Sequence, residues 1–117
     1  MRYQSLFIAG NAAHIVPPTR AKDLNLAASD VWYMAEAFTE VYSNGSNAGF
    51  EHYSDRALTR VWIAIRFSSW FTHLTHCFPH GGPDSLEHKL QITELNYIVN
   101  SEDASKSLAE NYIGLPI

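Results

Sequence analysis

Apolar positions follow a helical period over most of the chain. After Leu24 they recur at intervals of three and four residues, and Asn44-Gly45 then supplies a left-handed stop. The pattern predicts a first helix from Leu24 to this stop. The apolar residues on one face of this helix are Val31, Met34, Ala35, Phe38, Val41 and Tyr42.

A second helical stretch must end before Pro79, because the residue preceding a proline is pushed toward extended geometry. Trp62, Phe67 and Trp70 lie off its main stripe, so the helix is apolar nearly all round. Such a helix usually packs between two surfaces, and we expect a neighbour beyond the first helix. The stripe comprises Phe50, Tyr53, Ala57, Val61, Ala64, Ile65, Ser68 and Phe71.

The C-terminal third begins at Gly81-Gly82-Pro83, which interrupts the helical pattern. Leu86, Leu90, Tyr97 and Ile98 then share one side, which predicts a third helix. A short fourth helix is expected from Ser101 to Ala109, followed by an extended tail containing Gly114 and Pro116.

The N-terminal segment has a different pattern. The apolar run from Leu6 to Ala9 is short and ends at Gly10, which predicts one buried strand. Pro17 and Pro18 prevent a continuous helix from Asn11 to Asp23, so we expect an ordered loop there. The predicted fold class is therefore mainly α, with one short strand and three or four helices. A lone strand cannot bury itself, so the fold resembles part of a larger one.

Composition narrows the function classes. The 117 residues carry a formal charge of −4 with only eight Lys and Arg, which argues against nucleic acid as a partner. Cys77 is the only cysteine, so no internal disulfide forms and a cytoplasmic location is expected. No apolar run reaches the roughly 20 residues needed to cross a membrane. The high apolar share, 46% against 17% charged, hints at missing partner surface.

The loop sequence carries a family resemblance. The stretch from Phe7 to Val31 includes the run Gly10-Asn11-Ala12-Ala13-His14-Ile15-Val16-Pro17-Pro18-Thr19 and resembles the second flavin motif of class A flavoprotein monooxygenases. The sequence from Ile15 to Thr19 is similar to that of the 4-hydroxybenzoate 3-monooxygenase branch of this family. Further resemblance covers Arg60 to Phe71, Gln91 to Leu95, and Ala109 to Pro116.

This resemblance implies a fold and a domain organisation. The chain would be the C-terminal part of an α/β FAD/NAD(P)-binding monooxygenase fold. It would form a single partial domain, with the strand and flavin-ring loop in residues 1–24 and the helical region in residues 25–117.

The resemblance also implies roles for individual residues. Asn11 stands where the family has an aspartate that binds a ribityl hydroxyl of FAD. The helix start at Leu24 and Asn25 would face the flavin pyrimidine edge, where free amides and the helix dipole stabilise negative charge.

Three further residues would serve the substrate and the chemistry. The carbonyl of Pro18 would contact the substrate phenol, and Thr19 would lie beside the same ring. Tyr112 would extend the proton relay to that phenol, so Pro18 and Tyr112 form the expected catalytic set. Removing the phenolic proton enriches the ring for oxygen attack.

The chain departs from the family pattern at the cofactor. Asn11 lacks the charge that makes such hydrogen bonds roughly twice as strong. Arg20 and Asp23 replace glycines that let the backbone approach the flavin ring. No Gly-x-Gly-x-x-Gly follows a strand, so the site for the FAD pyrophosphate is absent from this sequence. Weakened FAD binding is therefore expected.

Two functions follow from this combination. The first is a portion of an FAD-dependent monooxygenase that hydroxylates 4-hydroxybenzoate-like phenols, with NAD(P)H as cosubstrate, and that is inactive alone. The second is a non-enzymatic helical remnant that acts through self-association or association with a flavoprotein. The family's C-terminal helices include subunit contacts, so a homodimer through this region is expected.

Several other side chains allow two interpretations. His73, His76, Cys77 and His80 have a spacing that metal ligands can adopt, but Pro79 bends the chain between them, and we favour ordinary core or surface roles and no metal. His14 has no acid or nucleophile at short spacing and is interpreted as structural.

Aromatic and basic residues outside the motif are equally open to two interpretations. Trp62 and Trp70 are eight residues apart and would line a ligand pocket or, more commonly for such stripes, pack. Lys22 would add positive potential near the cofactor or would simply be solvated.

Overall fold

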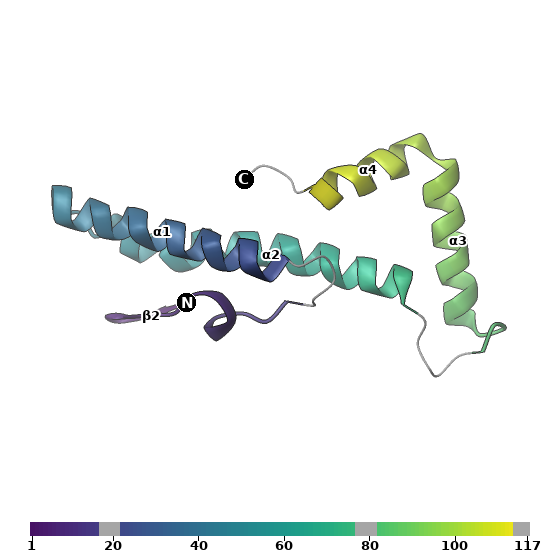
Figure 1. Cartoon of the computed structure of the whole chain (residues 1–117), viewed down its shortest axis with the longest axis horizontal. Coiled ribbons are helices and arrows are strands. Elements are labelled where there is room, and N and C mark those ends of the chain that lie inside the picture. Colours follow the sequence, from purple (N-terminus) through teal and green to yellow (C-terminus); the bar gives the residue numbers. More distant parts are fainter. Residues whose placement is uncertain (17–21, 77–81, 114–117) are drawn as a thin grey trace. The chain divides into compact units, whose positions relative to one another are not determined.

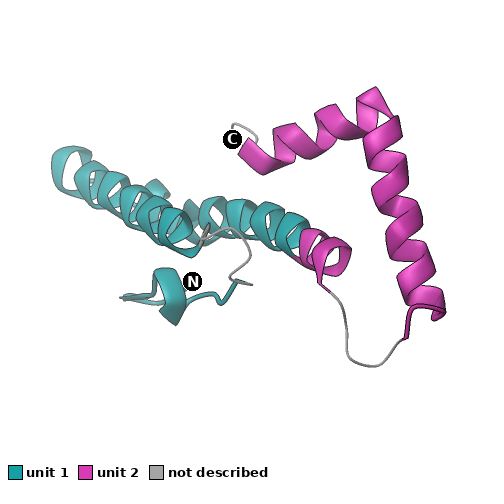
Figure 2. Ribbon diagram, turned by 45° about the vertical axis from the view of Figure 1, so that its right-hand side comes forward, with its two compact units in different colours: residues 1–68 teal, residues 69–117 magenta. Residues whose placement is uncertain are grey.

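The computed structural model describes residues 1–16, 22–76 and 82–113. It divides into two compact units, Met1–Ser68 and Ser69–Ile117, with the boundary inside a long helix. Figure 2 colours the two units separately. Four helices dominate the described chain (Figure 1), which confirms the mainly α fold class.

The N-terminal segment forms a small hairpin and one helical turn. Strands β1 (Arg2–Tyr3) and β2 (Leu6–Phe7) pair antiparallel, with Arg2 opposite Phe7. The expected strand is thus shorter than its apolar run, and it has a partner strand that the sequence pattern did not reveal. A 3-10 helix, η1 (Gly10–Ala12), follows directly.

Helices α1 (Lys22–Asn44) and α2 (Ala48–Thr75) form an antiparallel pair (Figure 1). The turn between them begins at Gly45, whose φ of +69° is left-handed and whose amide donates to the carbonyl of Val41. Both helices agree with the sequence prediction, although α1 begins two residues before Leu24.

The core of the first unit lies between the two helices and the N-terminal segment. The stripe predicted for α2 is largely buried, with Tyr53, Ala57, Val61, Ala64 and Ser68 each less than 7% exposed. Phe67, which the pattern placed off the stripe, is buried as well. The buried residues that α1 and the preceding segment add are Val16, Leu26, Asp30 and Ala37.

The buried side of α1 is not the apolar face expected from the sequence. Val31, Phe38 and Tyr42 are exposed in the described chain, whereas the small residue Ala37 faces α2. A Cβ added at Gly49 would lie 2.9 Å from the Cα of Ala37, so α1 and α2 approach too closely there for large side chains.

Polar contacts also join α1 and α2. The guanidinium of Arg56 pairs with Glu36 at 3.0 Å and lies 4.5 Å from the ring centre of Tyr33. Glu40 accepts hydrogen bonds from the amide of Gly49 and the hydroxyl of Ser46. A carboxylate at the N-terminus of α2 is favourable because it complements the helix dipole.

The second unit contains the end of α2 together with α3 (Leu86–Asn100) and α4 (Glu102–Ile113). The Ser85 hydroxyl caps α3 by accepting from the amide of His88, and the extended residue Ser101 separates α3 from α4. The fourth helix is therefore confirmed, and it is longer than the pattern indicated. The tail with Gly114 and Pro116 lies outside the described residues.

Candidate functional site

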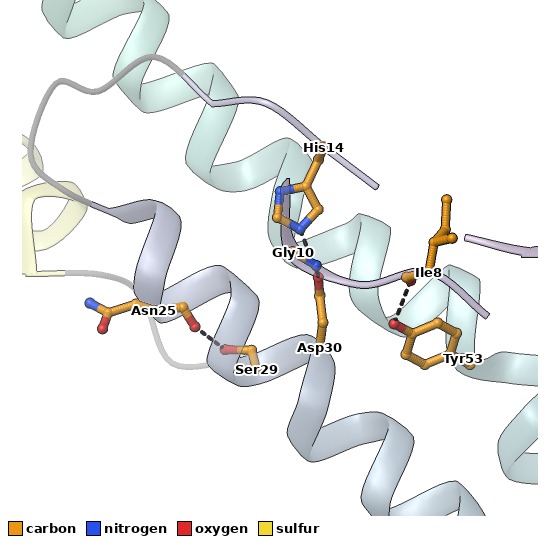
Figure 3. Close-up of polar contacts among 7 residues, drawn as sticks. All are labelled: Ile8, Gly10, His14, Asn25, Ser29, Asp30 and Tyr53. Carbon is orange, nitrogen blue, oxygen red and sulfur yellow. Dashed lines mark hydrogen bonds and ion pairs between the residues drawn. The ribbon is translucent and has the colours of Figure 1, made fainter. Parts of the chain in front are cut away.

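Asp30 lies on the buried side of α1 and is only 1% exposed. One of its carboxylate oxygens, Oδ2, accepts a hydrogen bond of 2.8 Å from the backbone amide of Gly10 and one of 2.7 Å from Nε2 of His14 (Figure 3). Gly10 is the first residue of η1, and His14 lies two residues beyond its last residue, Ala12. A single oxygen of α1 therefore contacts the chain at the start of η1 and just after its end.

The His14 ring is almost fully buried beside this carboxylate. Because Nε2 is paired with Asp30, the remaining ring nitrogen is Nδ1, which is buried and has no hydrogen-bond partner within the described part of the chain. The structural interpretation of His14 is supported by this pairing. Its acidic partner was missed because the two residues are 16 positions apart.

Tyr53 attaches the same segment to the other helix. Its hydroxyl donates a hydrogen bond of 2.9 Å to the carbonyl of Ile8 (Figure 3). Burial, together with the nearby negative charge of Asp30, raises the pKa of the Tyr53 phenol to about 12, so the hydroxyl keeps its proton and remains a donor.

Gly10 brings η1 against α1. Its φ of +61° is left-handed, and an added Cβ would lie 3.1 Å from the Cβ of Ala27. This position therefore favours glycine for its backbone angle and for its close approach. Ala27 shares a helix face with Leu24, three residues earlier, so η1 packs about one turn from the start of α1.

The residues expected at the cofactor are exposed on these two elements. Asn11 is exposed on η1, and both Leu24 and Asn25 are exposed in the first turns of α1. A helix that begins at Lys22 leaves the amides of its first turn without intrahelical acceptors, and Leu24 belongs to that turn. The carbonyl of Asn25 accepts from the Ser29 hydroxyl at 2.8 Å (Figure 3).

Asp23 also lies in the first turn of α1 and is partly buried. A carboxylate in this position complements the positive end of the helix dipole. Asp23 therefore has a stabilising role in the helix itself.

The remaining expected site residues are distributed differently. Pro18, Thr19 and Arg20 lie outside the described residues. Tyr112 belongs to α4 in the second unit, where its half-exposed ring packs edge-on against Phe71 with ring centres 6.2 Å apart.

The histidine run shows no metal geometry in its described part. The carbonyls of His73 and His76 both accept from the Gln91 side chain, at 2.6 and 2.9 Å. Cys77 and His80 lie outside the described residues, and no group of three potential ligands is found among the others.

The two tryptophans noted in the sequence differ in the exposed fraction of their side chains. Trp62 is 63% exposed in the part of the chain that the structure describes. Trp70 is more covered, at 37%. The side chain of Lys22 is not among those described. None of the described helices is long and apolar enough to cross a membrane.

Comparison with known proteins connects this geometry to a cofactor. A family model described as an FAD binding domain matches residues 1–68, which contain the Asp30 contacts, Asn11 and the start of α1. The chain belongs to the FAD binding domain family. Membership confirms the resemblance inferred from the loop sequence.

Similarity to a curated relative extends beyond the FAD binding domain region. The p-hydroxybenzoate hydroxylase of Acinetobacter baylyi is 53% identical to this chain over 116 residues, or 99% of the chain. The match covers 28% of that relative, so the chain spans a little over a quarter of the relative's length.

Sequence reasoning missed two residues that organise this FAD binding domain segment. Asp30 was given no role in the sequence analysis, and Tyr53 was counted only as an apolar position of the second helix. One signal was present: Asp30 follows Leu26 by four residues and precedes Ala37 by seven, which places a carboxylate on the buried side of α1. A buried carboxylate requires a hydrogen-bonding partner elsewhere in the chain.

Proposed function

We propose that this chain supplies the flavin-ring loop and C-terminal helices of an FAD-dependent monooxygenase that hydroxylates 4-hydroxybenzoate-like phenols with NAD(P)H as cosubstrate. The observation that carries the proposal is the 53% identity to a p-hydroxybenzoate hydroxylase over nearly the whole chain. At this identity the two chains are expected to share backbone geometry and the placement of the loop residues.

The fit of FAD is supported by the exposed ends of η1 and α1. Asn11 presents an amide that can both donate to and accept from a ribityl hydroxyl. The first-turn amides of α1, which have no intrahelical acceptors, together with the exposed Leu24 and Asn25, suit the negatively charged pyrimidine edge of a flavin. When bound, FAD supplies the oxygen-transfer chemistry that the protein's own side chains lack.

In this proposal the protein itself orients the phenol and moves its proton. The Pro18 carbonyl and Thr19 hold the ring of the aromatic acid. The hydroxyl of Tyr112 receives the phenolic proton through the relay and passes it toward solvent, to which Tyr112 is half exposed. The deprotonated ring is the better nucleophile.

We further propose that the chain is inactive on its own. Its sequence contains no Gly-x-Gly-x-x-Gly segment for the FAD pyrophosphate, and Asn11, Arg20 and Asp23 each weaken contact with the flavin. Catalysis then requires the dinucleotide-binding region of a flavoprotein hydroxylase.

The test combines binding and turnover. The purified chain is titrated with FAD while visible absorbance and circular dichroism are recorded, and then assayed for hydroxylated product with 4-hydroxybenzoate and NAD(P)H. We expect weak FAD binding and no product. Product formed by the chain alone would refute the proposed inactivity, and complete absence of FAD binding would refute the cofactor role.

A second proposed function, association without catalysis, is favoured by the apolar surface of α3 and α4. Leu90 is 60% exposed, and the other exposed apolar residues of these helices are Leu86, Ile92, Leu95, Tyr97, Val99 and Ile113. Of these, Leu86, Leu90 and Tyr97 share one face of α3, and an exposed apolar face is common at subunit interfaces. We therefore propose a homodimer through the C-terminal helices.

Sedimentation equilibrium of the chain and of Leu90→Glu tests the dimer. We expect the wild-type chain to dimerise and Leu90→Glu to shift it toward monomer, while Glu94→Gln on the same helix, also exposed, leaves the equilibrium unchanged. A monomeric wild-type chain would exclude this function.

A further inference from the structure

The two parts of the proposed flavin contact belong to different elements. Asn11 is on η1, and Leu24 and Asn25 begin α1. Five residues between the two elements, 17–21, are not described. The described contacts that set η1 against α1 are the packing of Gly10 on Ala27 and the two hydrogen bonds to Asp30.

Asp30 is well placed to fix this arrangement. Its Oδ2 accepts a hydrogen bond from the amide of Gly10, the first residue of η1. The same atom pairs with Nε2 of His14, two residues after the end of η1. The amides of Ala13 and His14 in turn donate to the carbonyl of Gly10, so backbone hydrogen bonds link Gly10 directly to the residues that follow η1.

A packing role alone does not explain a carboxylate at this position. Taking a carboxylate out of water is costly, and an apolar side chain of similar size packs at least as well between helices. The carboxylate can also orient η1 relative to α1, because two hydrogen bonds to one oxygen fix the position and the angle of the turn.

We propose that Asp30, together with His14, is a positioning residue that sets Asn11 and the first turn of α1 in one fixed arrangement for the flavin. The inference rests on the proposed function but makes a claim of its own about the chain without cofactor. His14 acts through Asp30, since its other ring nitrogen has no partner among the described residues.

The test compares three variants of the whole chain. Asp30→Ala removes both hydrogen bonds. Asp30→Asn retains an oxygen that can accept from the Gly10 amide, with the weaker strength of a neutral acceptor, and serves as the conservative rescue. Asp55→Ala removes an exposed acid from α2 and is the matched control.

Two readouts are taken. The first is NMR without FAD: the contact between the Gly10 Hα and the Ala27 methyl group, and amide exchange from Gly10 to His14. The second is the FAD dissociation constant and the visible circular dichroism of bound flavin, which reports the environment of the ring and is unaffected by a merely structural loss elsewhere.

In Asp30→Ala we expect the Gly10–Ala27 contact to disappear, exchange at Gly10 to accelerate, and FAD affinity to fall by about tenfold or more, as for loss of a charged hydrogen bond. The dichroism of any bound flavin should change as well. In both the NMR and the flavin readouts, Asp30→Asn should give values between those of Asp30→Ala and wild type, and Asp55→Ala should match wild type.

An unchanged Gly10–Ala27 contact and unchanged exchange in Asp30→Ala would overturn the proposal. If the wild-type chain binds no FAD, the proposed function fails, while the NMR contact still decides whether Asp30 positions η1. If Asp30→Ala unfolds, the intermediate Asp30→Asn decides, and wild-type behaviour of Asp30→Asn in every readout would overturn the role of the charge.

Discussion

The hydroxyl of Tyr53 and the carbonyl of Ile8 meet at 2.9 Å although the two residues are 45 positions apart. The bond ties the strand end to α2, while Asp30 ties the following turn to α1. The N-terminal segment is thus attached to both helices of the first unit. Each attachment can be tested separately.

Replacing Tyr53 with Phe should lower the free energy of unfolding by about 1 kcal/mol, because it removes one hydrogen bond and leaves the Ile8 carbonyl without its donor. Urea denaturation followed by circular dichroism measures the change. Tyr42→Phe is the control, since the ring of Tyr42 is 83% exposed. Equal stability of Tyr53→Phe and wild type would show that the bond contributes nothing.

The raised pKa of Tyr53 gives the same variant a pH signature. The pKa rises from 10.0 to about 12 in the folded chain, so the folded state retains the phenolic proton that the unfolded state loses. The stabilisation is fully present below pH 10 and is lost as the pH rises toward about 12. Urea midpoints should therefore fall more steeply with pH in wild type than in Tyr53→Phe over this range, and parallel slopes would contradict the assignment.

Replacing Gly49 with Ala should destabilise the first unit by about 1–3 kcal/mol, because overpacking forces backbone shifts. The new Cβ would lie 2.9 Å from the Ala37 Cα and 2.7 Å from a Glu40 carboxylate oxygen. Thermal unfolding detects the loss. Gly82→Ala is the matched control, since an added Cβ meets nothing within 4 Å there, and a similar loss in both variants would disprove the steric explanation.

Gly45 should tolerate Asn better than Ala. Its φ of +69° costs a residue with Cβ roughly 1–2 kcal/mol, but Asn adopts this conformation more readily than other residues. An added Cβ meets no atom within 4 Å, so only the backbone angle is tested. Chemical denaturation should rank the stabilities as Gly, then Asn, then Ala, and a different order would show that the turn relaxes.

Changing Asn11 to Asp should strengthen FAD binding. A carboxylate accepts a hydrogen bond from a ribityl hydroxyl about twice as strongly as an amide, which corresponds to an increase in affinity of about tenfold. Absorbance titration with FAD measures it. Asn47→Asp introduces the same charge at an exposed position between α1 and α2 and should leave affinity unchanged. Equal gains in both variants would indicate a nonspecific effect of charge.

The helices were predictable because each rests on local signals. The Asn44-Gly45 stop marks the end of α1, and the stripe containing Tyr53, Ala57 and Val61 is the buried face of α2. The sequence of the loop was specific enough to indicate the family of class A flavoprotein monooxygenases. These features depend on residues within a few positions of each other.

Contacts between distant residues could not be predicted in the same way. Nothing near His14 in sequence indicates Asp30, and the buried side of α1 is set by the close approach at Gly49 and Ala37 rather than by its largest apolar residues. The strand partner of Leu6 was missed because Arg2 and Tyr3 form a strand of only two residues. Such pairings depend on three-dimensional packing.

The wide separation of these contacts has a consequence for biosynthesis. A ribosome makes the segment from Ile8 to His14 before its two partners, because the carboxylate that accepts from Gly10 follows 20 residues later and the phenol that donates to Ile8 follows after 45. Loops of this length close more slowly than a helix turn forms. The segment from Ile8 to His14 therefore acquires these native contacts only after Tyr53, in the first part of α2, has been synthesised.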